Sequence, residues 1–260
     1  MNDADVTLVG AGIMSATLAV FLKELNPDLT INIYERLNQP ALESSDAWNN
    51  AGTGHSAYCE LNYTPMDVNG AIDAHKAIKI AEQYQLSLQF WSYLVQHNKI
   101  TSPDNFIHSV PHLSFVWGSE NVVYLKKRYD ALVKNTLFSD MKFSSDFNQL
   151  NDWMPLVMVN RNLEEKVAAT YMSKGTDVNF GSLTRTLFDY LKSLKNVTIH
   201  YNYEVKNLKK REDNSWRIKI KEPIKSESFK INSDLVFLGA GGGALLLLDK
   251  DDIDESIGVG

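Results

Sequence analysis

The first 35 residues constrain the fold of this chain more than any other part of it. Apolar runs at residues 6–9 and 31–34 are typical of buried parallel strands, and the segment between them, 13–25, has a helical pattern that stops at Asn26-Pro27. A strand, a helix and a second strand within about 30 residues are usual for a right-handed parallel unit. We therefore expect an α/β fold with a parallel sheet that begins at the N-terminus.

Glycines join the first strand to the helix in the pattern Gly10-x-Gly12-x-x-Ser15. Gly10 permits a tight turn, and Gly12 lets the backbone approach a pyrophosphate at the helix N-terminus. Ser15 is small enough for the helix to pack on the strand. Glu35 ends the second strand, where a carboxylate can accept hydrogen bonds from both hydroxyls of an adenosine ribose and would repel a 2′-phosphate. The pattern predicts an adenine-dinucleotide site; the alternatives are a chance glycine turn and a solvated charge at Glu35.

The order of the remaining elements favours FAD over NAD. An NAD domain usually has a third parallel strand soon after the second, but here a long polar loop occupies residues 38–66. The elements predicted after it are helices at 71–98 and 120–135 and strands at 112–117, 197–201, 204–209, 216–221, 229–231 and 234–238, with only short elements in 136–170. The third parallel strand is thus expected at 197–201, followed by an antiparallel meander with a turn at Asp213-Asn214. An insertion between parts of the nucleotide fold suits a flavin enzyme.

The remaining expectations from local sequence concern turns and element boundaries in the second half of the chain. A second glycine cluster at 239–243 follows a predicted strand, and it is either another close approach of backbone to cofactor or a flexible turn. Turn chemistry is expected at 175–179, and Ser182 is the expected cap of a helix that follows. An element is also expected to begin at 245–248.

Composition narrows the class of protein. The chain carries 26 Lys and Arg against 32 Asp and Glu, a formal net charge of −6, and 206–211 is its main basic stretch; no basic face for nucleic acid is predicted. The single cysteine, Cys59, excludes an intrachain disulfide and a multi-cysteine metal site, and we predict no metal. One thiol fits a reducing cytoplasm. The longest apolar run, 235–248, is shorter than the about 20 residues that span a bilayer, which leaves peripheral membrane contact open.

Several segments resemble the malate:quinone oxidoreductases. They are residues 9–18 (VGAGIMSATL), 48–57 (WNNAGTGHSA) with 59–64 (CELNYT), 175–184 (GTDVNFGSLT) and the cluster at 239–244. The resemblance covers nearly the whole chain, and the block at 48–64 is its most specific part. It implies an FAD enzyme of the tricarboxylic acid cycle that oxidises (S)-malate to oxaloacetate and passes electrons to a membrane quinone. It also implies a peripheral protein on the cytoplasmic face of the cell membrane.

These features together predict a Rossmann-like FAD-binding fold with a β-meander and an inserted α+β substrate region. The FAD-binding domain is expected at 1–65 and 175–260, and the insertion at 66–174. Members of the family are substantially longer, so we expect a C-terminal truncation that leaves the substrate region incomplete. The residues expected to contact the cofactor are Gly10, Gly12, Ile13, Met14, Ser15, Glu35, Arg36, Gly52, Thr53, Gly54, Val205, Gly239, Ala240 and Gly241.

Oxidation of a secondary alcohol requires a base for the hydroxyl proton while hydride leaves the carbon. His55 is the first candidate, because it lies in the glycine-rich loop and histidine titrates near neutral pH; the alternative is that it orients the loop or binds phosphate. Arginine and lysine suit the two carboxylates of malate. Arg161 and Lys174 are the candidates, against the alternative that they are surface charges.

The other candidate side chains have simpler interpretations. His75 and His97 lie in or at the end of a predicted surface helix and are expected to be structural. Cys59 is expected to be a small buried thiol, with a flavin thioether or a reactive thiol as alternatives. Two rival functions remain open for the chain: a related flavin oxidase that acts on another 2-hydroxy acid with oxygen as acceptor, and a nucleotide-binding module without redox activity.

Overall fold

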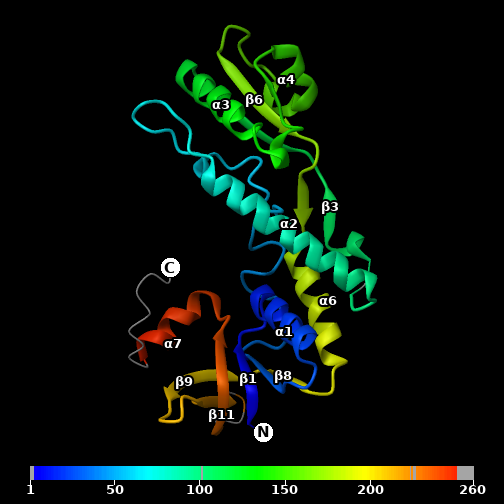
Figure 1. Cartoon of the computed structure of the whole chain (residues 1–260), viewed down its shortest axis with the longest axis vertical. Helices are drawn as coiled ribbons and strands as arrows, with labels where there is room; N and C mark the ends of the chain where they lie inside the picture. The colour runs from blue at the N-terminus through cyan, green and yellow to red at the C-terminus, as the bar shows by residue number, and fades with distance from the viewer. Residues whose placement is uncertain (1–2, 101, 223, 225–226, 251–260) are drawn as a thin grey trace. The chain divides into compact units, whose positions relative to one another are not determined.

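The chain divides into two compact units. A computed structural model describes residues 3–100, 102–222, 224 and 227–250 (Figure 1). Unit 1 consists of Met1–Ala51, Asn98–Phe106 and Asn179–Gly260, and unit 2 consists of Gly52–His97 and Ile107–Val178. These borders differ from the predicted ones at 65/66 and 174/175. The difference arises because Thr53 pairs with Asp177 inside unit 2 and because the Phe106 carbonyl accepts a hydrogen bond from the Asn179 N–H inside unit 1.

The elements follow the predicted order closely. The described helices are α1 (Ile13–Leu25), α2 (His75–Gln96), α3 (Ser119–Leu132), α4 (Phe147–Trp153), α5 (Pro155–Met158), α6 (Phe180–Lys192) and α7 (Ala244–Lys250), with short 3₁₀ helices at Leu61–Tyr63, Pro103–Asn105, Thr136–Phe138 and Gly241–Gly243. The described strands are β1 (Ala4–Val9), β2 (Ile31–Glu35), β3 (Ile107–Ser109), β4 (His112–Trp117), β5 (Lys142–Ser144), β6 (Val167–Met172), β7 (Thr176–Val178), β8 (Val197–Tyr201), β9 (Glu204–Lys210), β10 (Trp216–Glu222) and β11 (Glu227–Leu238).

Unit 1 is built on a six-stranded sheet in the order β8-β2-β1-β11-β10-β9. β8, β2, β1 and β11 are parallel, and β11, β10 and β9 form the antiparallel meander. All of β2 is buried, as expected for a strand covered on both faces. The Rossmann-like α/β fold predicted from the sequence is confirmed, including the late third parallel strand.

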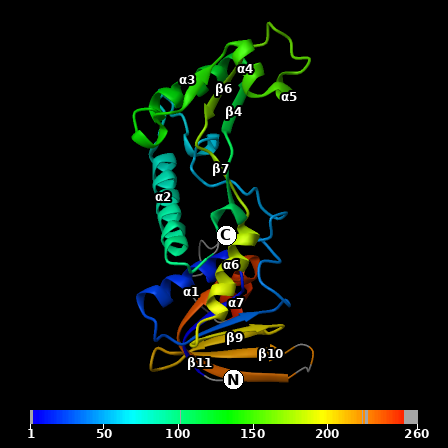
Figure 2. The same ribbon diagram turned by 90° about the vertical axis from the view of Figure 1, so that its right-hand side faces the viewer.

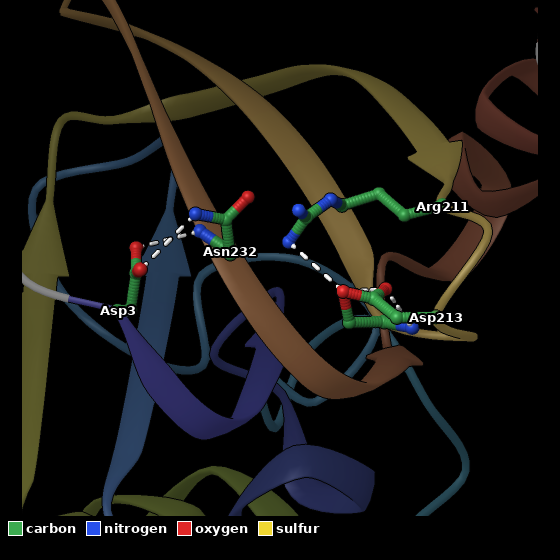
Figure 3. A network of polar contacts seen from close by, with 5 residues as sticks. Asp3, Arg211, Asp213 and Asn232 are labelled. Atoms are coloured by element: carbon green, nitrogen blue, oxygen red, sulfur yellow. Dashed lines mark hydrogen bonds and ion pairs between the residues drawn. The ribbon is translucent and has the colours of Figure 1, made fainter.

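β11 differs from the prediction of two separate strands at 229–231 and 234–238. Its first half pairs with β10 and its second half with β1, so one strand serves both parts of the sheet. At the exchange point the Asp3 carboxylate accepts hydrogen bonds from the Asn232 N–H (2.8 Å) and Nδ2 (3.0 Å) (Figure 3).

Helices α1 and α6 pack against each other in unit 1 (Figure 1). The N-cap of α6 is Asn179, whose side chain accepts a hydrogen bond from the Ser182 N–H (2.9 Å); the prediction that Ser182 is the cap was wrong. Asn179 is the better cap because it places an acceptor three residues before a free N–H. Residues 176–178, predicted as a turn, form the short strand β7 paired with β3.

Unit 2 contains the three-stranded sheet β4-β6-β5 (Figure 2). Alternate side chains cover its two faces: Val116 and Ala168 pack on α3, while Phe115 and Ala169 pack with residues of α4 and α5. The sequence left 136–170 undecided because these elements are too short to show a period. None of the helices in the described part of the chain combines the length and apolarity needed to cross a membrane.

Candidate nucleotide site

A crevice in unit 1 lies at the carboxyl ends of β1, β2 and β11. It consists of two adjoining cavities of about 320 and 600 Å³ that share several lining residues, among them Gly10, Glu35, Arg36 and Glu43. The smaller cavity is lined by apolar and aromatic residues together with the charged Glu204 and Lys206, and the larger one includes backbone from the two glycine clusters. The predicted contact residues that line one or both are Gly10, Gly12, Ile13, Met14, Glu35, Arg36, Val205, Gly239, Ala240 and Gly241. Ligands of open α/β sheets bind at this edge.

Gly10 has a conformation that other residues rarely adopt. Its φ is +95°, and a β-carbon built on it would lie 2.5 Å from the carbonyl oxygen of Gly239. The two glycine clusters are therefore in direct contact, because β1 and β11 are parallel neighbours. This contact explains the second cluster without a flexible turn and brings backbone from both loops to the larger cavity.

The N-terminus of α1 opens into the same cavity. Gly12 is its N-cap and contributes no side-chain cap, and the first amide, Ile13 N–H, donates to Ser45 Oγ (2.9 Å). Ser15 is fully buried, and its hydroxyl has no hydrogen-bond partner among the described residues. The helix dipole and free amides at such an end favour an anionic group.

Glu35 is buried, with 6% of its surface exposed, which excludes the alternative of a solvated strand-end charge. One carboxylate oxygen accepts the Ala11 N–H (2.7 Å) and the other accepts the Leu37 N–H (2.8 Å). A carboxylate has about four acceptor sites, so two remain after these bonds. The backbone thus fixes an anionic acceptor between the two cavities, where hydroxyl groups of a sugar would be satisfied.

Tyr34 and Tyr203 are the aromatic residues that line the smaller cavity. Tyr34 stacks on His200 with ring centroids 4.6 Å apart, and Tyr203 meets both rings edge-on. The Tyr34 hydroxyl is buried without a hydrogen-bond partner in the described part of the chain, and burial raises the pKa of Tyr34. An aromatic wall with an unsatisfied hydroxyl suits a heteroaromatic base. Amides, carboxylate and aromatic wall together fit an adenine dinucleotide such as FAD.

The sequence analysis missed part of this crevice. Glu43 and Ser45 come from the loop after β2, Tyr203 from the turn between β8 and β9, and Leu246 from α7. Glu43 forms an ion pair with Arg36, and each side chain is more than half exposed. No spacing rule marks these positions, because they reach the crevice through the path of a long loop.

Gly52, Thr53, Gly54 and His55 belong to unit 2. Gly52 has φ +64°, and a β-carbon there would lie 2.8 Å from Asp177 Oδ1. The Gly54 N–H donates to the Thr176 carbonyl (3.0 Å). His55 is exposed, and its N–H donates to the Thr53 carbonyl (2.9 Å). Gly52 and Gly54 pack against β7 in this structure. Their contact with a cofactor stays a prediction.

Arg128 of α3 holds the continuation of this segment and was not singled out from the sequence. It is fully buried; Nε donates to Thr64 Oγ1 (3.0 Å) and Nη2 to the carbonyls of Ala57 (3.2 Å) and Tyr58 (3.1 Å). Nη1 has no hydrogen-bond partner among the described residues. Burial lowers the pKa of the Arg128 guanidinium. A buried cation that binds three backbone or hydroxyl oxygens fixes the shape of residues 57–64.

The two candidate substrate ligands already hold carboxylates. Arg161 Nη1 lies 2.7 Å from Glu165, and its guanidinium stacks on the Phe115 ring at 4.7 Å. Lys174 is mostly exposed and pairs with Asp140, which raises the pKa of Lys174. The two cations, both within the described residues, thus have different carboxylate partners, Glu165 for Arg161 and Asp140 for Lys174.

The remaining histidines and the cysteine are also placed. His75 begins α2 and His97 is its C-cap, and both are exposed. Cys59 is half-buried, with Sγ 3.9 Å from His112 Nδ1. Burial, with the nearby Glu60 carboxylate, raises the pKa of Cys59 to about 11. Among the described residues, no three His, Cys, Asp or Glu side chains are grouped to bind a metal.

The fold and crevice define a dinucleotide-binding α/β protein, and solved structures share this architecture. Glycine oxidase from Geobacillus kaustophilus matches with a TM-score of 0.68 at 14% identity over 96% of this chain and 58% of its own. L-amino acid deaminase from Proteus vulgaris matches with 0.66 at 16% identity over 96% and 56%. L-α-glycerophosphate oxidase from Mycoplasma pneumoniae, solved with FAD bound, matches with 0.61 at 16% identity over 91% and 53%.

The chain belongs to the malate:quinone oxidoreductase family, whose model matches residues 2–260. A probable malate:quinone oxidoreductase from Flavobacterium johnsoniae is 61% identical over 259 residues, which are 100% of this chain and 52% of that protein. One from a Geobacillus species is 52% identical over 260 residues, 100% and 51% of the two chains. The chain spans about half the length of the curated relatives it matches.

Proposed function

We propose that this chain provides the FAD-binding part of an enzyme that oxidises (S)-malate to oxaloacetate and reduces a quinone to a quinol in the tricarboxylic acid cycle. The observation that carries the proposal is the family match over residues 2–260. The reaction balances, because the two electrons and two protons that leave the alcohol are those that the quinone gains. The relatives are named for this pair of substrates.

The crevice in unit 1 supports FAD as the cofactor. FAD, when bound, supplies the two-electron acceptor for the alcohol carbon. Glu35 would accept hydrogen bonds from the ribose hydroxyls, and the amides at the start of α1 and at residues 239–241 would hold the diphosphate. Tyr34, Val205 and their apolar neighbours would cover the base. The same residues give the 2′-phosphate of NADP an unfavourable carboxylate neighbour.

His55 is the proposed base for the hydroxyl proton, since its side chain is exposed at the end of a segment that the backbone holds in place. Gly52, Thr53 and Gly54 are proposed to approach the cofactor. Arg161 and Lys174 are proposed to bind substrate carboxylates. For each of them, malate would have to displace the carboxylate already bound, Glu165 or Asp140.

The quinone acceptor bears on the cellular location of the protein. A membrane quinone is dissolved in the bilayer, so the enzyme must approach a lipid surface to reduce it. We propose a peripheral position on the cytoplasmic face of the cell membrane.

The test is the visible spectrum of the purified full-length protein, followed by anaerobic addition of malate and then of a quinone. Flavin bands that malate bleaches and the quinone restores are expected. Bleaching that only oxygen reverses, with peroxide formed, would instead support a 2-hydroxy acid oxidase. A protein that binds ADP-ribose but shows no flavin bands after saturation with FAD would be a nucleotide-binding module without redox activity.

A further inference from the structure

The meander of unit 1 has two faces of opposite character. Its inner face is apolar and buried, with Leu208, Ile218, Ile220 and Ile231 in one cluster. Successive side chains of a strand point to opposite faces, so the residues between these point outward. The outward positions of these strands, which Figure 2 labels β9, β10 and β11, include five cations that we call the basic face: Lys209, Arg217, Lys219, Lys221 and Lys230. The same face holds polar residues such as Asn207 and Asn232. Lys221 is half-buried and the other four are exposed.

The strand register places these cations side by side. Lys219 lies directly opposite Lys230, and Arg217 directly opposite Lys209. Like charges at such positions destabilise a sheet. Within the described part of the chain, no ion pair neutralises any of the five. Glu204, which lies opposite Lys221 in the strand register, forms its ion pair with Lys206, and Asp213 forms one with Arg211 (Figure 3).

Sheet stability does not account for the basic face. Lysine on an edge strand protects against aggregation, but β10 carries three of the five cations and is flanked by β9 and β11. Neighbouring strands lie about 4.8 Å apart and residues rise about 3.4 Å, so the five charges share roughly 10 by 14 Å. They do so in a chain whose formal net charge is −6.

We propose that the basic face binds the anionic headgroups of a lipid bilayer. This inference rests on the proposed function, because a bilayer-dissolved quinone requires the protein to meet a lipid surface. Charge complementarity selects an anionic surface. The aromatic residues of the meander, Trp216 and Phe229, are half-buried against the core and do not extend from this face to stack on bases.

The test measures binding of the full-length protein to vesicles of phosphatidylcholine with phosphatidylglycerol, and to vesicles of phosphatidylcholine alone. The variant Arg217→Gln/Lys219→Gln/Lys221→Gln removes three cations of the basic face. Each cation near an anionic surface contributes about fivefold to the binding constant, so a loss of about a hundredfold is expected. Wild-type binding should fall with rising salt, because screening shortens the range of the attraction.

Two matched variants keep the result interpretable. Lys79→Gln/Lys134→Gln/Lys195→Gln removes the same charge from exposed positions elsewhere and is expected to bind as the wild type does. Lys219→Arg/Lys221→Arg keeps the charge and should also bind. The melting temperature of the triple basic-face variant should not fall, since the substitutions relieve the repulsion within the sheet.

Equal losses in the two triple variants would overturn the inference, as would wild-type binding to both vesicle types alike. Tighter binding to a DNA duplex than to the anionic vesicles at the same salt would overturn it in favour of nucleic acid. Malate-dependent reduction of a water-soluble dye is measured in parallel. If the dye is reduced while the vesicles are not bound, this inference fails and the proposed function stands; if the vesicles are bound and no dye is reduced, the proposed function fails.

Discussion

The nucleotide crevice of unit 1 and residues 52–64 of unit 2 both contain glycines in close contact with neighbouring atoms, but different groups fix the backbone in the two regions. In the crevice, backbone meets backbone: Gly10 lies against Gly239, and Glu35 is fixed by two amides. In unit 2, distant side chains hold the segment, above all Arg128. The glycine turn and Glu35 of the crevice are marked by local spacing in the sequence. A segment held by side chains depends on residues that no local pattern marks.

Gly10→Ala should have the largest effect on this comparison. A β-carbon at φ +95° is strained and would meet the backbone oxygen of Gly239, which cannot move without shifting β11. We expect a loss of roughly 4 kcal/mol in the free energy of unfolding and no retained FAD. Urea unfolding and the flavin-to-protein ratio measure both. In Gly242→Ala the new β-carbon meets nothing within 4 Å, and its unfolding free energy should change by less than about 0.5 kcal/mol. Equal stability of the two variants would refute the close approach.

Arg128→Met tests the side-chain-held segment. The substitution keeps most of the volume but leaves the Ala57 and Tyr58 carbonyls and Thr64 Oγ1 without their donor. We expect a loss of roughly 3 kcal/mol in unfolding free energy, and faster amide hydrogen exchange in residues 57–64. Arg161→Met removes an ion pair whose side chains are partly exposed, and it should cost less than about 1 kcal/mol. Unchanged exchange in residues 57–64 would show that Arg128 does not hold the segment.

Glu35→Gln tests the anionic acceptor in the crevice. Glutamine keeps one carbonyl acceptor but loses the charge that strengthens hydrogen bonds from hydroxyls. FAD affinity, measured by fluorescence quenching or calorimetry, should fall about tenfold, or about 1.4 kcal/mol. Glu212→Gln, at an exposed position in the β9–β10 turn, serves as the control and should bind FAD as the wild type does. Equal affinities in the two variants would remove Glu35 from the site.

The titration of Cys59 should leave the protein unchanged at neutral pH and act only in alkaline solution. Its pKa is raised from 9.0 to about 11, mainly by burial. The folded state therefore favours the neutral thiol, and this contribution to stability is present below pH 9 and is lost as pH rises toward 11. Alkylation by iodoacetamide should accelerate up to about pH 11 in the folded protein, but level off near pH 9 in urea. A folded-state profile with its midpoint near pH 9 would contradict the burial of this thiol.

Local sequence predicted the parallel core of unit 1 well. The boundaries of α1 were predicted as observed, and the third parallel strand was expected at 197–201, where β8 lies, because apolar runs and the stop at Asn26-Pro27 are local signals. Elements that depend on a partner were predicted poorly. β7 exists because β3 and Thr53 pair with it, and β11 continues past Asn232 because its second half pairs with β1.

The basic face shows the same limit. In the sequence its cations are dispersed at alternate positions over three strands, so composition and the stretch at 206–211 predicted no basic surface. The register of β9, β10 and β11 gathers them on one side. The sequence also did not predict the ion-pair partners of Arg161 and Lys174. Glu165 is four residues from Arg161, yet the pair forms only because the turn after α5 brings the two side chains together.

The amino-acid sequence alone determined the β–α–β unit, the glycine turn and the acidic residue that closes the second strand. Each of these depends on backbone conformation over a few consecutive residues, which the residues themselves set. Only the tertiary structure decided that Gly10 touches Gly239, that Arg128 holds residues 57–64 and that five cations share one face. Those contacts join residues far apart in the chain or on different strands, and their free energy exists only once strand register and packing have brought the partners together.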